Sequence, residues 1–453
     1  MQNNEYQNST QPENEPQSGS YGAKYQGQTP PSIPPQNNGN GYPYGSPYEK
    51  APKKPKTVPL YAVIAIVLIT AVVTFQATSI GYMLLNSGDD GIPSYFDSAL
   101  TIDEYLRTYY IGELDEELLS QALAAALLYA SGDAYAYYYT PEDYMQESMS
   151  YEGNAVGIGV LVTYREDGYI EILRVFNDGP ASKAGIKKGD IIIAVNGEDI
   201  AEMGYENSVK AIQGEIGTEV SLTVKRGEET LTLTATRAEY VQQTVDGHIY
   251  KDGTTEKKIG VVQIYSFNNS TTEQFKTKVT ELIEAGAEGL IFDVRDNPGG
   301  TLNSVVKMLD FLLPEGKIVR IIDKNGKEVQ SYSSDKNCID LPMAVLTNEN
   351  TASAAELFTS ALKDYNKAIS VGTKSYGKGT MQIMIPLPDG GAFKFSYRFY
   401  SPPFSDNYNG IGISPEIELP LTEGANINYL TDENDNQLAA AAEYIISGTL
   451  PTN

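Results

Sequence analysis

The sequence predicts an α+β multidomain chain with an N-terminal transmembrane helix, a helical segment, a small β-rich domain and a larger α/β domain. Three observations support this class. The chain has 453 residues, too many for one compact unit at about 150 residues per domain. Residues 58–75 form an apolar run without a charge. Beyond residue 150, short β-runs come first, and alternating strands and helices follow from about residue 258, which is typical of an α/β layer.

The composition excludes several kinds of site. The one cysteine, Cys338, cannot form an internal disulfide framework or a multi-cysteine metal site. The one histidine, His248, excludes His-rich metal sites and would have to serve any Ser-His-Asp triad alone. It lies in 246–253, a segment typical of a turn or an inter-domain hairpin, so we expect an exposed structural role and no part in catalysis. The formal net charge of -26 argues against nucleic-acid binding, because phosphate contacts need clustered basic residues.

The N-terminal part has the features of a membrane anchor. Residues 1–57 are rich in Gln, Asn, Pro, Gly, Ser and Tyr, which predicts a disordered tail. The apolar run would be about 27 Å long as a helix, and the uncharged stretch continues, which predicts a transmembrane helix at 58–85. A cleaved signal peptide is the alternative, but the tail before it is too long. Lysines flank the run on its N-terminal side and place that side in the cytoplasm, namely Lys50, Lys53, Lys54 and Lys56. We therefore expect a single-pass protein of the cell membrane whose larger part is extracytoplasmic.

Residues 92–150 carry helical patterns. Thr101-x-x-Glu104 is typical of a capping box at the start of a helix. Apolar residues at helical spacing follow, namely Leu118, Leu119, Ala122, Leu123, Ala126 and Leu127. We expect a helical pair that leads into the globular part, and we interpret the tyrosines of 135–139 as packing residues.

Three glycine-containing segments mark the β-rich region 151–240. They are GIGV at 157–160, GPASKAGI at 179–186 and KGDIIIAVNG at 188–197. Backbone amides at a glycine-flanked strand start can bind a carboxylate, and a strand edge beside a helix can accept an extended peptide. In this order the three segments resemble a PDZ domain. The resemblance implies capture of a peptide C-terminus with an apolar last side chain, and its carboxylate loop would be Gly157, Ile158, Gly159 and Val160.

A serine and a lysine are candidates for a nucleophile and its base. Ser353 lies between a predicted strand and a predicted helix, where free amides and the helix dipole favour developing negative charge. The structural alternative is helix capping, because Ser353-x-x-Glu356 is also a capping box. Lys378 has uncharged neighbours, so burial can lower its pKa and let it act as a base, whereas Lys374 lies in a more polar stretch. On a strand, Gln382 shares a face with Lys378 and can orient its amine.

A predicted strand runs into an Asn-Pro-Gly-Gly turn at 292–300. Alone, this segment is best interpreted as a tight turn. Beside a nucleophile, the amide of Gly299 or Gly300 can form an oxyanion hole with the amide of Ala354.

From about residue 95 to 417 the chain resembles the carboxy-terminal processing peptidases, or tail-specific proteases, which are PDZ-containing serine peptidases. Besides the PDZ segments, the resemblance rests on motifs at 132–133, 139–144, 293–300, 351–356, 377–382 and 412–416. It implies Ser353 as nucleophile, Lys378 as general base and Gln382 as the residue that orients the lysine. It also implies a ClpP/crotonase-like α/β serine peptidase core at 241–425, a C-terminal helix or tail at 426–453, no cofactor and no metal. A homodimer formed through the helical segment fits the family, and a bacterial cell membrane suits the architecture.

The predicted function is that of a membrane-anchored serine endopeptidase that recognises the free C-terminus of extracytoplasmic proteins and cleaves them with a Ser-Lys dyad. Two alternatives stay open. One is a non-catalytic, membrane-tethered PDZ scaffold or receptor, against which the joint presence of Ser353, Lys378 and Gln382 argues. The other is a Ser-Lys hydrolase without tail specificity, which the PDZ segments and the Asn-Pro-Gly-Gly turn disfavour.

One position departs from the family pattern. Many relatives have arginine in the motif Ile-Arg-Gly-x-x-Gly-Thr, where this chain has Gln213. Where that arginine couples tail binding to assembly of the active site, glutamine lacks the charge that the coupling uses. We expect the cleavage rate to depend only weakly on an occupied PDZ groove. Complete inactivity of the isolated peptidase domain, rescued only by a PDZ-bound tail, would contradict this expectation.

Overall fold

The computed structural model describes residues 94–251 and 257–449. The predicted cytoplasmic tail (1–57) and transmembrane helix (58–85) lie outside these residues. Within the described ranges, no helix is long and apolar enough to cross a membrane. The chain divides into two compact units, residues 1–102 and 103–453, and helix α2 (Ser94–Tyr109) spans their boundary.

The predicted helical segment contains three helices, α2, α3 (Glu116–Ala130) and α4 (Pro141–Glu152). The side chains of Asp115 and Thr140 cap the starts of α3 and α4. The predicted capping box at Thr101 is wrong, because Thr101 lies inside α2 and its hydroxyl donates to the Asp97 carbonyl. A threonine can bond to the carbonyl four residues earlier, so the motif also fits a helix interior.

A small sheet with its own core forms the β-rich domain. Its strands, in order across the sheet, are β3 (Val160–Tyr164), β4 (Ile170–Val175), β5 (Ile191–Val195), β7 (Glu219–Arg226) and β8 (Glu229–Thr236), with β6 (Glu198–Asp199) beside β5. The helices of this region are α5 (Pro180–Lys183), α6 (Ile200–Met203) and α7 (Tyr205–Ile212). Ile170, Ile192 and Leu222 are fully buried in its core. Strand β3 stands at the edge of the sheet, where an extended peptide can pair with it.

A separate two-stranded sheet joins the two ends of this domain. Strand β2 (Asn154–Gly157) enters it and strand β9 (Ala238–Val241) leaves it, and the two are antiparallel partners.

A six-stranded sheet organises the larger domain. Its order is β10 (Val245–Ile249), β11 (Ile259–Ile264), β12 (Gly289–Asp293), β15 (Met343–Thr347), β16 (Ala368–Gly372) and β19 (Ile417–Glu418). The strands from β11 to β19 are parallel, and β10 is antiparallel to β11.

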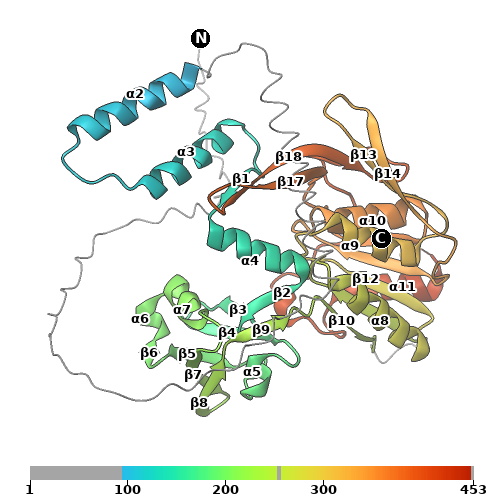
Figure 1. Ribbon diagram of the computed structural model, residues 1–453. Coiled ribbons are helices and arrows are strands. Elements are labelled where there is room, and N and C mark those ends of the chain that lie inside the picture. Colours follow the sequence, from blue (N-terminus) through green and yellow to red (C-terminus); the bar gives the residue numbers. More distant parts are fainter. Residues whose placement is uncertain (1–93, 252–256, 450–453) are drawn as a thin grey trace, which may run out of the picture. The chain divides into compact units, whose positions relative to one another are not determined.

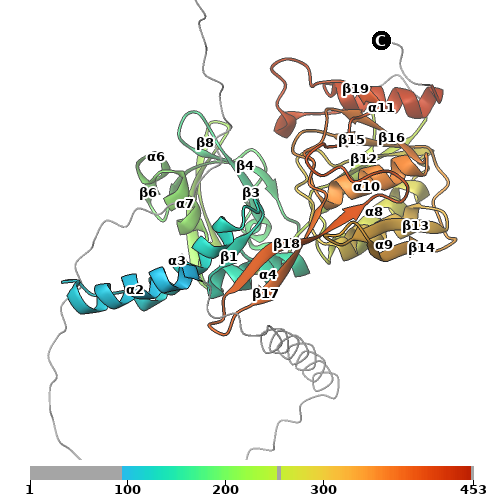
Figure 2. The same cartoon turned by 90° about the horizontal axis from the view of Figure 1, so that it is seen from above.

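Helices cover both faces of this sheet. On one face pack α8 (Thr271–Glu284), α9 (Leu302–Leu312) and α10 (Ala354–Asp364), and on the other packs α11 (Asn436–Ser447) (Figure 2). Side chains alternate along each strand. Val262 of β11 therefore packs in the core on the side of α8, α9 and α10, and Val261 packs in the core on the side of α11. The carboxyl ends of β12 and β15 lead into the segments that carry the candidate catalytic residues.

The second sheet of this domain includes a long hairpin. Its strands are β1 (Tyr137–Tyr139), β18 (Ala392–Ser401), β13 (Gly316–Ile322) and β14 (Glu328–Ser334) in order, with β17 (Thr380–Pro386) paired to β18. Figure 1 shows the β17–β18 hairpin reaching out from the core to meet β1. A segment from before the β-rich domain is thereby part of the second sheet of the larger domain.

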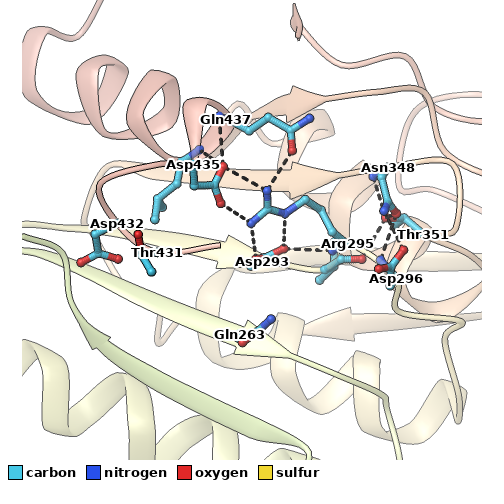
Figure 3. Close-up of polar contacts among 12 residues, drawn as sticks. Gln263, Asp293, Arg295, Asp296, Asn348, Thr351, Thr431, Asp432, Asp435 and Gln437 are labelled. Carbon is cyan, nitrogen blue, oxygen red and sulfur yellow. Dashed lines mark hydrogen bonds and ion pairs between the residues drawn. The ribbon is translucent and has the colours of Figure 1, made fainter. Parts of the chain in front are cut away.

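A buried ion-pair network fastens α11 to the end of β12 (Figure 3). The guanidinium of Arg295 donates to both oxygens of Asp293 and of Asp435 at 2.7 to 3.2 Å. It also donates to the Gln437 side chain at 2.9 Å. All four residues are buried. Buried charges are tolerated only when paired, and here each carboxylate has the arginine as its partner.

Replacing Arg295 with leucine should therefore lower the free energy of unfolding by about 3–5 kcal/mol, because two carboxylates stay buried without a counter-charge. Arg107→Leu is the matched control, since Arg107 also pairs with two carboxylates but is exposed. Its loss should cost far less, because water screens an exposed ion pair. Urea unfolding of both variants measures the difference, and equal losses would contradict the assignment.

Candidate active site

Ser353 occupies a strained turn between β15 and α10. Its φ and ψ are 57° and −118°, a left-handed backbone that a serine adopts only when its surroundings enforce it. The Ser353 amide donates to Oε2 of Glu356 at 2.9 Å, which is the predicted capping contact. The carbonyl of Ser353 accepts the amide of Leu357 at 3.0 Å. Helix capping and exposure of a reactive hydroxyl thus occur together in one turn.

The buried carboxylate of Glu356 links this turn to the loop that carries the lysine. Its Oε2 also accepts the amide of Lys378 at 2.7 Å. Its Oε1 accepts the Ser375 hydroxyl and the Gly377 amide, both at 2.6 Å. Glu356 has no exposed surface, so these four donors replace its water.

Lys378 lies half-buried at the end of this loop, just before β17. Burial lowers the pKa of its amine, and the nearby charge of Lys394 lowers it further. The carboxylates of Asp133, Glu356 and Glu147 act in the opposite direction. The amine lies over the ring of Tyr135, 4.3 Å from its centroid.

The serine and lysine side chains have separate partners in this structure. Tyr400, which is buried in β18, lies with its hydroxyl 3.2 Å from Ser353 Oγ and donates to the Lys378 carbonyl at 2.7 Å. Burial raises the pKa of Tyr400, so its hydroxyl stays protonated. Among the described residues, which include both of these, no hydrogen bond joins Ser353 Oγ to Lys378 Nζ. The backbones of the two residues are held together, but their reactive atoms are not.

Gln382 also has partners other than the lysine. Its Nε2 donates to the Thr380 hydroxyl at 3.0 Å and to Ser396 Oγ at 3.1 Å. The structure therefore places Gln382 in the site without a direct contact to the amine of Lys378.

The glycine turn lies against the nucleophile. The amide of Gly299 donates to the Asn297 side chain at 2.8 Å, so this donor is already used. Within the described residues, the amides of Gly300 and Ala354 have no hydrogen-bond acceptor. Gly300 and Ala354 line the same cavity as Ser353. Of the three predicted oxyanion donors, these two are free to bind a substrate oxygen.

A cavity of about 220 Å³ opens at Ser353. Apolar side chains form much of its wall, including Leu302, Val305, Leu357, Met381 and Met384. Ser353, Gln382 and Tyr400 also line it, whereas Lys378 does not. An apolar substrate side chain fits such a wall.

The predicted carboxylate loop of the PDZ domain lies between β2 and β3. Within the described ranges, the amides of Ile158 and Gly159 donate to no protein acceptor. The carbonyls of the same two residues accept the amides of Ala181 and Phe176, at 2.7 and 3.0 Å. The loop is thereby held in place, with two amides free next to the edge strand β3.

The remaining candidates give no further site. His248 pairs with Asp432 at 2.7 Å and is 54% exposed, away from the cavity residues. Among the described residues, no group of three or more His, Cys, Asp or Glu side chains is arranged to hold a metal. Sequence reasoning missed Tyr400 and Tyr135, because neither lies near Ser353 or Lys378 in the sequence.

Most of this chain is similar to known proteins. The model of Peptidase family S41 matches residues 258–419, and that of the PDZ domain matches residues 148–225. A probable CtpA-like serine protease of Staphylococcus aureus strain N315 is 31% identical over 375 residues, which cover 81% of this chain and 74% of that protein. A Staphylococcus epidermidis protein of the same description is 28% identical over 383 residues, with 82% and 75% covered. Among solved structures, a photosystem II D1 C-terminal processing protease is 28% identical, covers 71% of this chain and 86% of its own, and has a TM-score of 0.45.

The fold and the matches define a serine peptidase that carries a PDZ domain. The chain belongs to peptidase family S41 and is similar to the CtpA-like serine proteases. The resemblance inferred from the motifs is confirmed.

A methyl group at Gly299 should disable the site. It would lie 2.7 Å from Ser353 Cβ and 2.8 Å from the Ala354 nitrogen, and the φ of 101° adds strain. Shifting the nucleophile by about 1 Å can cost about a hundredfold in rate, so we expect at least that loss in Gly299→Ala. Gly326→Ala is the control, because Gly326 has a φ of 81° with nothing within 4 Å. Equal cleavage rates in the two variants would contradict the close packing of the turn.

Proposed function

We propose that this protein is a membrane-anchored endopeptidase that captures the free C-terminus of extracytoplasmic proteins and cleaves them with Ser353 and Lys378. The observation that carries the proposal is the Glu356 carboxylate, which binds the amides of Ser353 and Lys378 at 2.9 and 2.7 Å. It brings a serine in a strained turn beside a lysine whose pKa burial lowers. This is the combination that a serine nucleophile with a lysine base needs.

In the proposed reaction, Lys378 accepts the proton of the Ser353 hydroxyl as Oγ attacks the scissile carbonyl. The amides of Gly300 and Ala354 donate to the oxygen that becomes negative. The protonated lysine then gives its proton to the leaving amine, and water releases the acyl-enzyme. For this step Ser353 Oγ leaves the hydroxyl of Tyr400 and approaches the lysine amine, which stays over the ring of Tyr135. The longer separation before substrate binds is consistent with looser geometry in a free enzyme.

The PDZ domain provides the proposed specificity. The free amides of Ile158 and Gly159 are suited to a terminal carboxylate, and the edge strand β3 is suited to the residues before it. Gly157 and Val160 complete the proposed loop. The apolar cavity at Ser353 would take a side chain of the segment to be cut.

Two further parts of the proposal concern location and assembly. The uncharged run at 58–85 supports a membrane anchor with the tail inside and the peptidase outside. The helix α3 has no buried residue, and its Leu118, Leu123 and Leu127 are 42–56% exposed. Exposed apolar side chains in a row support a homodimer through this segment.

Cleavage of an unfolded protein that ends in an apolar free carboxylate tests the proposal. Ser353→Ala and Lys378→Ala should each lose activity by about a hundredfold or more, because nucleophile and base act as one unit. Lys374→Ala is the control and should keep it, since Lys374 is an exposed lysine of the same loop. The wild-type rate should rise with pH through the lowered pKa of Lys378, below the ordinary value of about 10.4, because only the neutral amine is a base.

Activity that survives Lys378→Ala would refute the dyad. Intact protein that binds the tail but does not cut would favour the scaffold alternative. Equal cleavage of free and amidated tails would favour the hydrolase without tail specificity.

A further inference from the structure

We propose that the aromatic ring of Tyr135 positions the amine of Lys378 and shields it from water, which makes Tyr135 a positioning residue for the general base. The inference rests on the proposed Ser-Lys chemistry. The amine lies 4.3 Å from the ring centroid, well within the distance at which an aromatic face attracts an ammonium group. In the part of the chain that the structure describes, this amine forms no hydrogen bond or ion pair, so the ring contact defines its place.

The position of Tyr135 is itself fixed by a carboxylate. Oδ1 of Asp133 accepts the Tyr135 amide at 3.0 Å, and its Oδ2 accepts the Ser396 amide at 2.6 Å. Immediately beyond, Tyr137–Tyr139 pairs with β18 as strand β1. The ring is therefore attached to the same hairpin that begins just after Lys378.

The same hydrogen bonds explain how Gln382 can act without touching the lysine. Its Nε2 donates to Ser396 Oγ at 3.1 Å, and this hydroxyl donates to Oδ1 of Asp133 at 3.1 Å. A continuous chain thus runs from Gln382 through Ser396 and Asp133 to Tyr135. We infer that Gln382 orients the base by holding the aromatic platform under it.

The ring has two opposed effects on the protonation of Lys378. Its face attracts the charged form, while its bulk keeps water away and disfavours that form. Burial is the larger effect on the pKa of the amine. The other charged groups that act on the amine are Lys394 from β18, Asp133 from the segment before β1, Glu356 from α10 and Glu147 from α4. The Tyr376 hydroxyl is a partner of Tyr135, and the Tyr400 hydroxyl donates to the Lys378 carbonyl.

The test uses the full-length protein and a fluorogenic, unstructured peptide with an apolar free C-terminus. In Tyr135→Ala, water reaches the amine, so kcat should fall about ten- to a hundredfold while KM changes little. The rising limb of its pH–rate profile should move to higher pH, toward the ordinary pKa of lysine. Tyr135→Leu, which keeps most of the packing volume, should show the same shift. Tyr135→Phe keeps the ring and should match the wild type in kcat and in pH profile.

Tyr137→Ala is the matched control, because Tyr137 lies in the same segment but packs against the ring of Tyr139. It should leave kcat and the pH profile unchanged. The proposal is overturned if Tyr135→Ala and Tyr135→Leu keep the wild-type kcat and the wild-type position of the rising limb of the pH–rate profile. It is also overturned if Tyr135→Phe is as impaired as Tyr135→Ala, or if Tyr137→Ala lowers kcat and shifts the profile as Tyr135→Ala does. Lys378→Ala distinguishes a failure of the proposed Ser-Lys chemistry from a failure of the proposed role of the Tyr135 ring. Full activity in that variant refutes the Ser-Lys chemistry itself, whereas an inactive Lys378→Ala beside an unchanged Tyr135→Ala refutes only the role of the ring.

Discussion

The active region depends on one buried carboxylate. Glu356 receives four hydrogen bonds. Two come from the amides of Ser353 and Lys378, and two come from the Ser375 hydroxyl and the Gly377 amide in the loop before Lys378. A buried polar side chain is tolerated only when hydrogen-bond partners replace water, and these four donors do so for Glu356. The left-handed backbone of Ser353 persists because this arrangement holds both of its sides. The same contacts therefore hold this loop together and position Ser353, the proposed nucleophile.

The glycine turn is held to the nucleophile turn by a second set of contacts, part of which Figure 3 shows. The Thr351 hydroxyl donates to the Val294 carbonyl at 2.8 Å, and the Asn348 side chain donates to Asp296 at 2.7 Å. On the other side of the sheet end, Arg295 ties the same segment to α11. The segment 293–300, which carries Gly300, is thus held from two directions. In the proposed reaction, donors that are held in this way need no rearrangement when charge develops.

Much of this architecture can be predicted from the sequence, and the exceptions have physical causes. The central strands β11, β12 and β15 are recognisable because they are buried on both faces and read as apolar runs. The hairpin β13–β14 is not, since most side chains of β14 are exposed and show no alternation. The residue types around Ser353 point to its chemistry, because turn, helix start and lysine lie close in sequence. The ring beside Lys378 gives no local signal, since Tyr135 is brought there by the pairing of β1 with β18 and by the hydrogen bonds of Asp133 to Tyr135 and Ser396.

The paired strands β2 and β9 make the PDZ domain an insertion within the peptidase rather than a module attached at one end. The chain leaves the peptidase sheet after β1 and returns to the peptidase at β10, and the amide of Gln242 donates to the Gly153 carbonyl at 2.8 Å where the two connections meet. The segments by which the chain enters and leaves the PDZ domain therefore lie side by side. A domain with adjacent ends can be gained, lost or exchanged during evolution without a gap to bridge. The same double attachment prevents free rotation about a single linker, so any movement of this domain must bend both strands at once.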